Sequence, residues 1–485
     1  MKQIPRHQVL RRVEFENPWW SPPFKIQPAF EGLQSPRPYL ELFQPLVEDR
    51  SIQRAVVLMG PRRVGKTVLI HHAIQRLLAR GVAPRRIAYF SVDHPLYNGL
   101  SLEELLTAYR DSIDTDPEAE PAFVFFDEIQ YLKGWEVHLK RLVDDYPKLK
   151  VIASGSAAAA LRLKSRESGA GRFTEFLLPP LTFHEYLRLR DREDLVQPAE
   201  EPREPYFHAT DIDSLNRSFL DYLNFGGYPE VVGSPQIRED PARFIKADII
   251  DKVLLRDLPS LYGIQDIPEL NHLFTTLAFN TADEVSLEEL SRNSGVAKNT
   301  IKRYIEYLEA AFLLKVVHRV DRDGRRFKRA NFFKVYLTTP SIRCALFAPV
   351  DSQDTTIGEL VETAIYSQWF HSTGGELHYA RWRHGEVDIV RVSPALQAPR
   401  ITWAVEAKWS DRIVAHPSEL KAALGFCRVN KLERMLVTTK TIRRETNING
   451  ITVSFKPASE YCYTVGRNII DDRLQTDNLP PSSRG

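Results

Sequence analysis

Short apolar runs alternate with amphipathic segments through the first third of the chain. The runs "RAVVLMG" (54–60), "PAFVFFDEI" (121–129) and "KLKVIASGS" (148–156) are too short for helices and predict buried strands. The segments "KTVLIHHAIQRLLARG" (66–81) and "WEVHLKRLVDDY" (135–146) carry apolar residues at helical spacing. Strands that alternate with helices predict a parallel, doubly wound α/β sheet.

Composition limits the classes of partner and compartment. The 485 residues include 65 Lys and Arg against 63 Asp and Glu, a net charge of +2, so a nucleic-acid surface would have to be a local patch. Cys344, Cys427 and Cys462 are far apart and fit neither a disulfide framework nor a metal-ligand spacing. No apolar segment resembles a signal peptide or reaches membrane length, so we expect a cytoplasmic protein without a membrane partner.

The strongest chemical signal follows the first predicted strand. "GPRRVGKT" (60–67) fits G-x-x-x-x-G-K-[ST] between a strand and a helix, which is the context of a phosphate-binding loop. Lys66 places a charge near the β and γ oxygens, and the Thr67 hydroxyl can ligate Mg²⁺, so the predicted cofactors are ATP and Mg²⁺. The predicted nucleotide-binding residues of the loop are Gly60, Pro61, Arg62, Arg63, Val64, Gly65, Lys66 and Thr67.

Polar residues follow two of the later buried strands. Asp127 is placed to hold Mg²⁺ through water, and Glu128 is placed to orient the water that attacks the γ-phosphate. Ser154 or Ser156 either senses the γ-phosphate or caps the helix predicted after it, and the sequence leaves both roles open.

Further motifs extend this pattern beyond the phosphate site. With "GAGRFTEFLLPPLTFHEYL" (169–187), "GGYPEVV" (226–232) and "VLLRDL" (253–258), the chain resembles a prokaryotic AAA-type ATPase family whose members carry a C-terminal nuclease-like domain, over roughly residues 35–440. The resemblance implies ATP hydrolysis completed by an arginine, often from a neighbouring subunit. Arg172 is the candidate, which implies a homo-oligomer such as a ring; the alternative is an arginine on a surface loop.

A helical pattern with a turn lies in the middle of the chain. "VSLEELSRNSGVAKNTIKRYIEYLEAAFLLKVV" (285–317) predicts a helix-turn-helix, and the strand and basic loop after it suggest a wing. DNA is the partner that such a module would bind; the alternative is a packing element with a solvated charged face. The candidate DNA contacts are Lys298, Asn299, Lys302, Arg303, Arg325, Arg326, Lys328 and Arg329.

Charged residues interrupt two apolar runs nearer the C-terminus. In "AVEAKWS" (404–410), Glu406 and Lys408 would share one face of a buried strand. Burying both is costly unless they pair with each other or bind something. The preceding strand, "GEVDIVRV" (385–392), carries Asp388 in the middle of its apolar run.

The helix before these strands adds another carboxylate. Glu362 in "IGELVETAIYSQWF" (357–370), together with Asp388, Glu406 and Lys408, resembles the PD-(D/E)XK nuclease core. The resemblance implies that Asp388 and Glu406 hold Mg²⁺, that Glu362 completes the metal shell, and that Lys408 positions or activates the attacking water. The alternative is a structural Glu406–Lys408 ion pair in a degenerate domain.

We therefore expect an α/β fold class, with a P-loop AAA-like parallel-sheet ATPase, a helical lid, a winged helix-turn-helix segment and a PD-(D/E)XK nuclease-like α/β domain. The expected parts are an irregular N-terminal arm (1–40), the ATPase core (41–190), a linker or insertion (191–206), the lid (207–280), the winged segment (281–345), the nuclease-like domain (346–465) and a disordered tail (466–485).

The leading functional hypothesis is an ATP-hydrolysing enzyme with a metal-dependent nuclease domain that processes DNA. One alternative is an ATP-switched DNA-binding or regulatory scaffold whose nuclease fold does not cleave. Another is a signalling ATPase that binds a protein partner through its Trp-rich arm, in which Trp19 and Trp20 otherwise anchor the arm to a domain surface.

Overall fold

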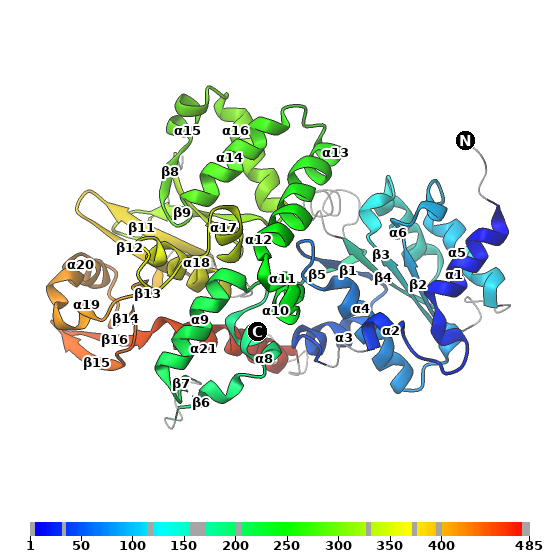
Figure 1. The fold of residues 1–485 in the computed structure, drawn as a ribbon, viewed down its shortest axis with the longest axis horizontal. Helices are drawn as coiled ribbons and strands as arrows, with labels where there is room; N and C mark the ends of the chain where they lie inside the picture. The colour runs from blue at the N-terminus through cyan, green and yellow to red at the C-terminus, as the bar shows by residue number, and fades with distance from the viewer. Residues whose placement is uncertain are drawn as a thin grey trace. The chain divides into compact units, whose positions relative to one another are not determined.

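Two units, Met1–Pro179 and Pro180–Gly485, make up the computed structural model (Figure 1). The structure describes residues 5–31, 35–113, 120–155, 171–199, 206–325, 331–370, 376–393 and 400–477. Each unit has its own central sheet, so each is described separately below.

The first unit is built on a parallel sheet with the strand order β2-β3-β4-β1-β5. These strands are β1 (Ala55–Met59), β2 (Ile87–Ser91), β3 (Ala122–Asp127), β4 (Leu149–Gly155) and β5 (Phe173–Leu177). The helices are α3 (Tyr39–Glu48), α4 (Lys66–Ala79), α5 (Leu102–Ile113) and α6 (Trp135–Asp145); α3 packs with α4, and α5 packs with α6. Residues of β1, β3 and β4 are buried throughout, as in a sheet covered on both faces, which confirms the predicted parallel α/β fold.

The N-terminal arm is more regular than its sequence suggests. It forms α1 (Arg6–Glu16), a 3₁₀ turn over Pro18–Trp20 and α2 (Pro28–Glu31), so the expectation of an irregular arm over 1–40 is wrong. Trp19 and Trp20 are buried, and their Nε1 atoms donate hydrogen bonds to the carbonyl oxygen of Ile87 on β2, at 3.0 and 2.7 Å. The two tryptophans therefore anchor the arm, as one of the two interpretations of the sequence predicted.

The second unit contains a mixed sheet with the strand order β15-β16-β14-β13-β12-β11-β9-β10-β8. Its strands are β8 (Glu284–Ser286), β9 (Leu314–Val320), β10 (Phe332–Leu337), β11 (Leu377–Trp382), β12 (Gly385–Val392), β13 (Ile401–Glu406), β14 (Arg434–Thr439), β15 (Arg444–Ile448) and β16 (Ile451–Pro457). β9 pairs in parallel with β11, Tyr379 lying opposite Arg319. The expected segments 281–345 and 346–465 therefore share one sheet, because this pairing joins them edge to edge (Figure 1).

Helices fill most of the expected lid region, 207–280. They are α9 (Ile212–Phe225), α10 (Pro229–Gly233), α11 (Pro235–Glu239), α12 (Pro241–Arg243), α13 (Leu258–Tyr262) and α14 (Ile267–Phe279), with π-helical turns over Phe244–Asp251 and Val253–Asp257. Later helices are α15 (Leu287–Ser294), α16 (Lys298–Ala310), α17 (Ser341–Leu346), α18 (Ile357–Trp369), α19 (Arg412–Ala415) and α20 (Lys421–Val429). None of the described helices is both long and apolar enough to cross a membrane.

The last helix, α21 (Ala458–Asp477), occupies part of the segment that the sequence predicted to be a disordered tail. It packs against α18 and α8 (Phe183–Leu189), so the part of the expected disordered tail up to residue 477 is helical. The expected linker or insertion (191–206) contains β6 (Val196–Pro198), which pairs antiparallel with β7 (Phe207–Ala209). The amide of Ala209 donates to the Glu460 carboxylate of α21 at 2.8 Å, so β7 is held against this helix.

Replacing Trp19 by Ala should lower the free energy of unfolding of the first unit by about 3–5 kcal/mol, because a fully buried indole and its hydrogen bond are removed. Urea denaturation followed by circular dichroism measures the change. Phe15→Ala is the matched control, since that ring lies on the same arm and is 69% exposed. Equal losses for both variants would contradict the anchoring role.

Candidate functional site

The predicted phosphate loop lies between the end of β1 and the start of α4. A Cβ atom on Gly60 would collide with the carbonyl oxygen of Leu178, and Gly65 has a left-handed φ of 94°, so both positions require glycine. The Lys66 ammonium is buried and donates to the carbonyl oxygens of Gly60 at 3.1 Å and Pro61 at 2.8 Å. The loop is thus held by its own lysine in a form that presents the helix N-terminus.

Arg37 provides a second support for this loop. Its guanidinium is buried and donates to the carbonyl oxygens of Val64 at 3.0 Å and Pro179 at 2.9 Å. No periodicity or motif pointed to Arg37, because its partners are backbone atoms far along the chain. Of the other loop residues, Arg62 is half-buried and Arg63 is exposed.

Asp127 lies at the carboxyl end of β3, beside the loop. It accepts hydrogen bonds from the Thr67 hydroxyl at 2.6 Å, from the Tyr89 hydroxyl at 2.9 Å and from the Ser154 hydroxyl. Burial, and then the neighbouring Glu128 charge, raises the pKa of Asp127. The predicted partners Thr67 and Asp127 are therefore together, and Tyr89 is a contact that the apolar run around it did not reveal.

Ser154 contacts the acid, which favours its role in the site over helix capping. Besides donating to Asp127, its Oγ accepts a hydrogen bond from the Glu128 amide at 3.2 Å. The other serine candidate, Ser156, lies outside the described residues.

Glu128 has a strained backbone. Its φ of 55° is left-handed, which costs a non-glycine residue about 1–3 kcal/mol and recurs at functional sites. The Gln130 amide donates to its carboxylate and so helps to orient it. The Thr67 hydroxyl and the Asp127 carboxylate are hard oxygen donors of the kind that Mg²⁺ takes, so the residues present fit that ion.

Arg172 lies near the amino ends of the strands, whereas the phosphate loop lies at their carboxyl ends. Its carbonyl accepts from the amide of Ala55, the first residue of β1, whereas the phosphate loop begins after Met59, the last residue. The strand between them is roughly 15 Å long. The Arg172 side chain forms an ion pair with Asp144 at 2.6 Å, so Arg172 does not join the phosphate site of its own chain.

In the second unit, the structure brings together three of the charged residues singled out in the sequence. The Lys408 ammonium lies 3.2 Å from Asp388 Oδ2 on β12 and 2.9 Å from Glu406 Oε1 at the end of β13. The Ala407 amide also donates to Asp388 Oδ2, at 2.8 Å. Thr438 on β14 bonds both the amide and the carbonyl of Lys408, at 2.7 and 2.8 Å, which fixes the backbone just beyond β13.

Glu362 reaches the same cluster from α18, but through different partners. Its Oε1 accepts from Lys334 Nζ at 3.0 Å and from the Tyr336 hydroxyl at 2.6 Å, and Lys334 also lies 2.7 Å from Glu386 Oε1. Lys334 and Tyr336 lie on β10, and sequence reasoning missed them. The available signal was a lysine inside the apolar run "FFKVYL" (332–337), the same kind of interruption that marked Asp388.

Burial dominates the electrostatics of this carboxylate–lysine cluster, which we define as Lys334, Glu362, Asp388, Glu406 and Lys408. Burial, and then the Asp388 charge, raises the pKa of Glu406 to about 8, against the opposing effect of Lys408. Burial likewise raises the pKa of Glu362 to about 7, although Lys334 acts to lower it. Burial acts to lower the pKa of Lys408, but the carboxylates of Asp388 and Glu406 raise it overall. The cluster therefore holds a proton near neutral pH.

The cluster carries oxygen donors of the kind that hard divalent cations take. It offers three carboxylates, and the buried Oε2 of Glu406 has no hydrogen-bond partner. Across the described residues, however, no three His, Cys, Asp or Glu side chains converge on one point. Lys408 contacts both Asp388 and Glu406, and Lys334 contacts Glu362, so ammonium groups neutralise the carboxylates that a cation would use.

The candidate DNA contacts on α16 are all exposed: Lys298, Asn299, Lys302 and Arg303. Two of them have acidic neighbours, since Lys298 lies 2.7 Å from Glu288 and Lys302 lies 4.0 Å from Glu306. Arg325 is exposed in the loop after β9. Arg326, Lys328 and Arg329 lie outside the described residues.

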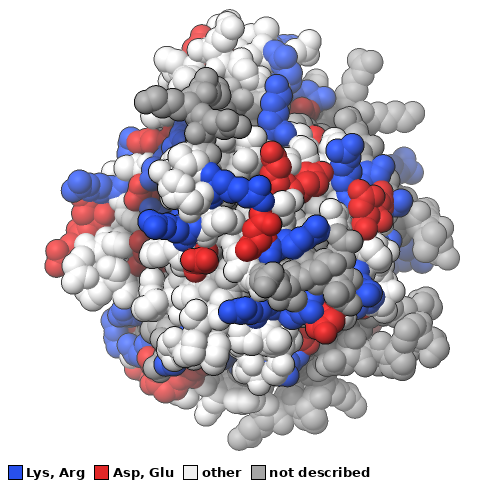
Figure 2. Space-filling view, turned by 90° about the vertical axis from the view of Figure 1, so that its right-hand side faces the viewer, with Lys and Arg blue, Asp and Glu red and all other residues white. Residues whose placement is uncertain are grey.

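Charge is mixed on the face drawn in Figure 2. Lys and Arg side chains there alternate with Asp and Glu side chains among the described residues in view. This agrees with the balanced composition of the chain. A polyanion would therefore need a local basic site rather than a field over this whole face.

Family models match two segments of the chain. Residues 52–187 match a family described as an AAA domain, and residues 216–354 match a domain of unknown function, DUF8612. The first segment contains the phosphate loop, Asp127 and Glu128 in the geometry given above. The first unit contains an AAA-type ATPase domain.

Relatives resemble the chain more broadly. An uncharacterized protein of Methanocaldococcus jannaschii is 24% identical over 389 residues, covering 76% of this chain and 80% of that protein. An uncharacterized protein of Haemophilus influenzae is 24% identical over 299 residues, covering 59% of this chain and 68% of that protein.

Solved structures resemble the chain only weakly. The replication initiator DnaA bound to AMPPCP and single-stranded DNA is 14% identical with a TM-score of 0.29, covering 60% of this chain and 92% of that chain. The S. cerevisiae Hsp104:casein complex is 17% identical with a TM-score of 0.29, covering 55% of this chain and 50% of that chain. TM-scores this low do not establish a shared fold, so the AAA assignment depends on the family model and on the loop geometry.

The pKa of Glu406 predicts a pH dependence of stability. Because its folded value of about 8 exceeds the unfolded value of about 4.3, the folded state keeps a proton that the unfolded state releases between these limits. The free energy of unfolding should fall as pH rises through this window, by up to about 1.4 kcal/mol per pH unit. The free energy of unfolding of Glu406→Gln should fall less steeply with pH, because the glutamine amide does not ionise in this range.

Urea denaturation in EDTA at pH 5, 6, 7 and 8 measures this dependence. Glu433→Gln, at an exposed carboxylate on the same unit, is the control and should keep the wild-type slope. Identical slopes for the wild type and Glu406→Gln would show that Glu406 is ionised throughout and would contradict the shared proton.

Proposed function

We propose that the chain is an ATP-hydrolysing enzyme that acts on nucleic acid, with DNA as the expected polymer. The AAA domain binds and hydrolyses ATP with Mg²⁺, and the carboxylate–lysine cluster is a nuclease-like site whose access the nucleotide state controls. The 2.6 Å hydrogen bond between Thr67 and Asp127 is the observation that carries the ATPase part, because it joins the phosphate loop to the acid at the end of β3.

Each residue of the phosphate site has a defined task in this proposal. Lys66 exchanges its carbonyl acceptors on Gly60 and Pro61 for β- and γ-phosphate oxygens. Thr67 and Asp127 hold Mg²⁺, which neutralises charge on the phosphates when bound. Glu128, with its constrained backbone and its contact to Gln130, orients the attacking water.

The cluster in the second unit is suited to phosphodiester hydrolysis. Glu362, Asp388 and Glu406 supply hard oxygen ligands for a divalent cation, which acts as a Lewis acid on the phosphate when bound. Lys408 lies within an ion-pair distance of two of these carboxylates, where its charge can stabilise the phosphoryl oxygens as negative charge develops.

Nucleic-acid binding and assembly complete the proposal. The order β8, α15, α16, β9, β10 supports a winged helix that presents the exposed residues of α16 to DNA. The helical segment 207–280 supports the proposed lid. Since Arg172 lies at the amino ends of the strands, away from the phosphate loop of its own chain, we assign it to the ATP site of a neighbouring subunit, which implies a homo-oligomer.

One specific observation favours a second candidate function. Lys334 and Lys408 already neutralise the carboxylates of the cluster, as expected of a nuclease fold retained for binding alone. A non-cleaving, ATP-switched scaffold is therefore the alternative. A signalling role through the Trp-rich arm has less support, because Trp19 and Trp20 are buried against β2.

Two lysine variants separate the two activities. Lys66→Ala should lower ATP turnover about 100-fold or more, because the charge on the transferred phosphate loses its partner. Lys408→Ala should lower cleavage by a similar factor and leave ATP turnover unchanged. Phosphate release is measured with Mg²⁺ in the presence of duplex DNA, single-stranded DNA or RNA, and the nucleic acid is then run on a gel. Lys133→Ala, at an exposed lysine of the AAA domain, is the control.

The possible outcomes are distinct. Turnover that rises with DNA, with cleavage lost in Lys408→Ala, supports the coupled enzyme. DNA binding without cleavage under Mg²⁺ or Mn²⁺ supports the scaffold. If no nucleic acid changes ATP turnover and all substrates remain intact, both the coupled enzyme and the scaffold are overturned and protein partners are favoured.

A further inference from the structure

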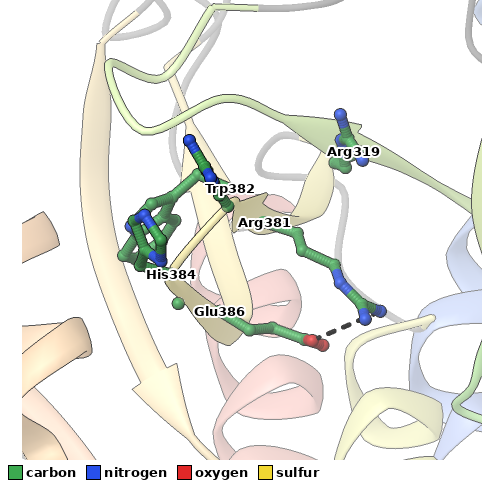
Figure 3. Close-up of a pocket in the computed structure, with 7 residues that line it drawn as sticks. Arg319, Arg381, Trp382, His384 and Glu386 are labelled. Atoms are coloured by element: carbon green, nitrogen blue, oxygen red, sulfur yellow. Dashed lines mark ion pairs between the residues drawn. The ribbon is translucent and has the colours of Figure 1, made fainter.

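A basic pocket of about 570 Å³ lies at the turn between β11 and β12 (Figure 3). Its volume is within the range of about 300–1,000 Å³ that is typical of ligand sites. The side chains that define it are Arg319, Arg381, Trp382, Arg383, His384 and Glu386. None of the sequence motifs pointed to this pocket, because its arginines come from β9 and from a hairpin that starts nearly sixty residues later.

Positive charge dominates the lining. Three guanidinium groups and one imidazole line the pocket, against the single carboxylate of Glu386. Arg381 lies 3.6 Å from Glu386 and 3.5 Å from Glu284, and Arg319 shares Glu284 at 3.7 Å. Glu284 also accepts a hydrogen bond from the Tyr379 hydroxyl at 2.6 Å, so one carboxylate serves several donors.

The hairpin that carries these groups is held in place. The Trp382 indole stacks on Phe426 with 5.8 Å between ring centroids and an interplanar angle of 15°. A Cβ atom on Gly385 would collide with Trp382 and with Ala422, so glycine lets the indole lie across the turn. The pocket wall is therefore fixed before any ligand binds, which lowers the entropic cost of binding.

The pocket adjoins the carboxylate–lysine cluster through Glu386, which contacts a cluster residue. Glu386 lines the pocket and lies 2.7 Å from Lys334, which in turn lies 3.0 Å from Glu362. Glu386 and Asp388 are two apart on β12, so they share one face of the strand. An anion in the pocket would therefore lie next to a phosphate that is bound at the carboxylate–lysine cluster.

We propose that this pocket binds a backbone phosphodiester of the nucleic-acid strand, next to the phosphate that the carboxylate–lysine cluster engages; this deepens the proposed function and depends on it. Arginine is suited to this ligand because its planar fork can donate two hydrogen bonds to one phosphate. Arg381 and Arg383 are exposed, where an incoming strand can reach them, and Arg319 lines the pocket as a half-buried arginine. The pocket reads no base, so it positions the strand without selecting its sequence.

Arg383→Gln tests the pocket with little risk to folding, because the residue is exposed in a two-residue turn. Binding of a fluorescein-labelled DNA duplex and of the matching single strand is measured by anisotropy over a range of salt concentrations, in EDTA to prevent cleavage. The variant should bind several-fold more weakly, and the slope of log affinity against log salt should fall by about 1. Arg319→Gln, at the half-buried arginine of the pocket, should show the same loss of affinity and of salt slope.

Arg444→Gln, an exposed arginine at the far end of the same sheet, is the control and should match the wild type. If the wild type binds neither DNA, the proposed function fails. If it binds and Arg383→Gln keeps both its affinity and its salt slope, the pocket proposal fails and the function stands.

Discussion

Both candidate sites depend on a carboxylate that is buried on a β-strand of the central sheet. Asp127 is 2% exposed and Asp388 is 7% exposed, and an ionised carboxylate at such depth is costly unless it is paired. Each sheet meets this constraint with groups from neighbouring strands and from the segment that follows a strand. The order of strands in each sheet therefore determines which side chains can form a site at all.

The two sites satisfy the constraint with different chemistry. Hydroxyl groups of Thr67 and Tyr89 donate hydrogen bonds to Asp127. An ammonium group, that of Lys408, pairs with Asp388, so a cation at Asp388 would compete with a charge of the same sign. If the second site binds a cation as we propose, Lys408 must first move away from Asp388, just as Lys66 must leave its carbonyl acceptors to reach a phosphate.

The sequence best predicts features whose residues lie close together in the chain. The loop 60–67 is contiguous, so its place between β1 and α4 followed from eight residues and their flanks. Asp388 and Lys408 were found because charged residues interrupt two apolar runs that follow one another in the chain, and β12 and β13 do pair in the sheet. Lys334 was missed because β10 reaches the cluster only after β9 pairs with β11. The motif around Arg172 does not reveal that this residue precedes a parallel strand and so lies at the amino ends of the strands.

Control of the second unit by the nucleotide is the central claim, and one binding measurement tests it most directly. The affinity of the protein for a labelled DNA duplex is compared with ADP and with a non-hydrolysable ATP analogue, in the wild type and in Lys66→Ala. We expect the affinities in the two nucleotide states to differ about tenfold, equal to about 1.4 kcal/mol, and this difference should disappear in Lys66→Ala. Equal affinity in both nucleotide states of the wild type, with both nucleotides bound, would contradict it.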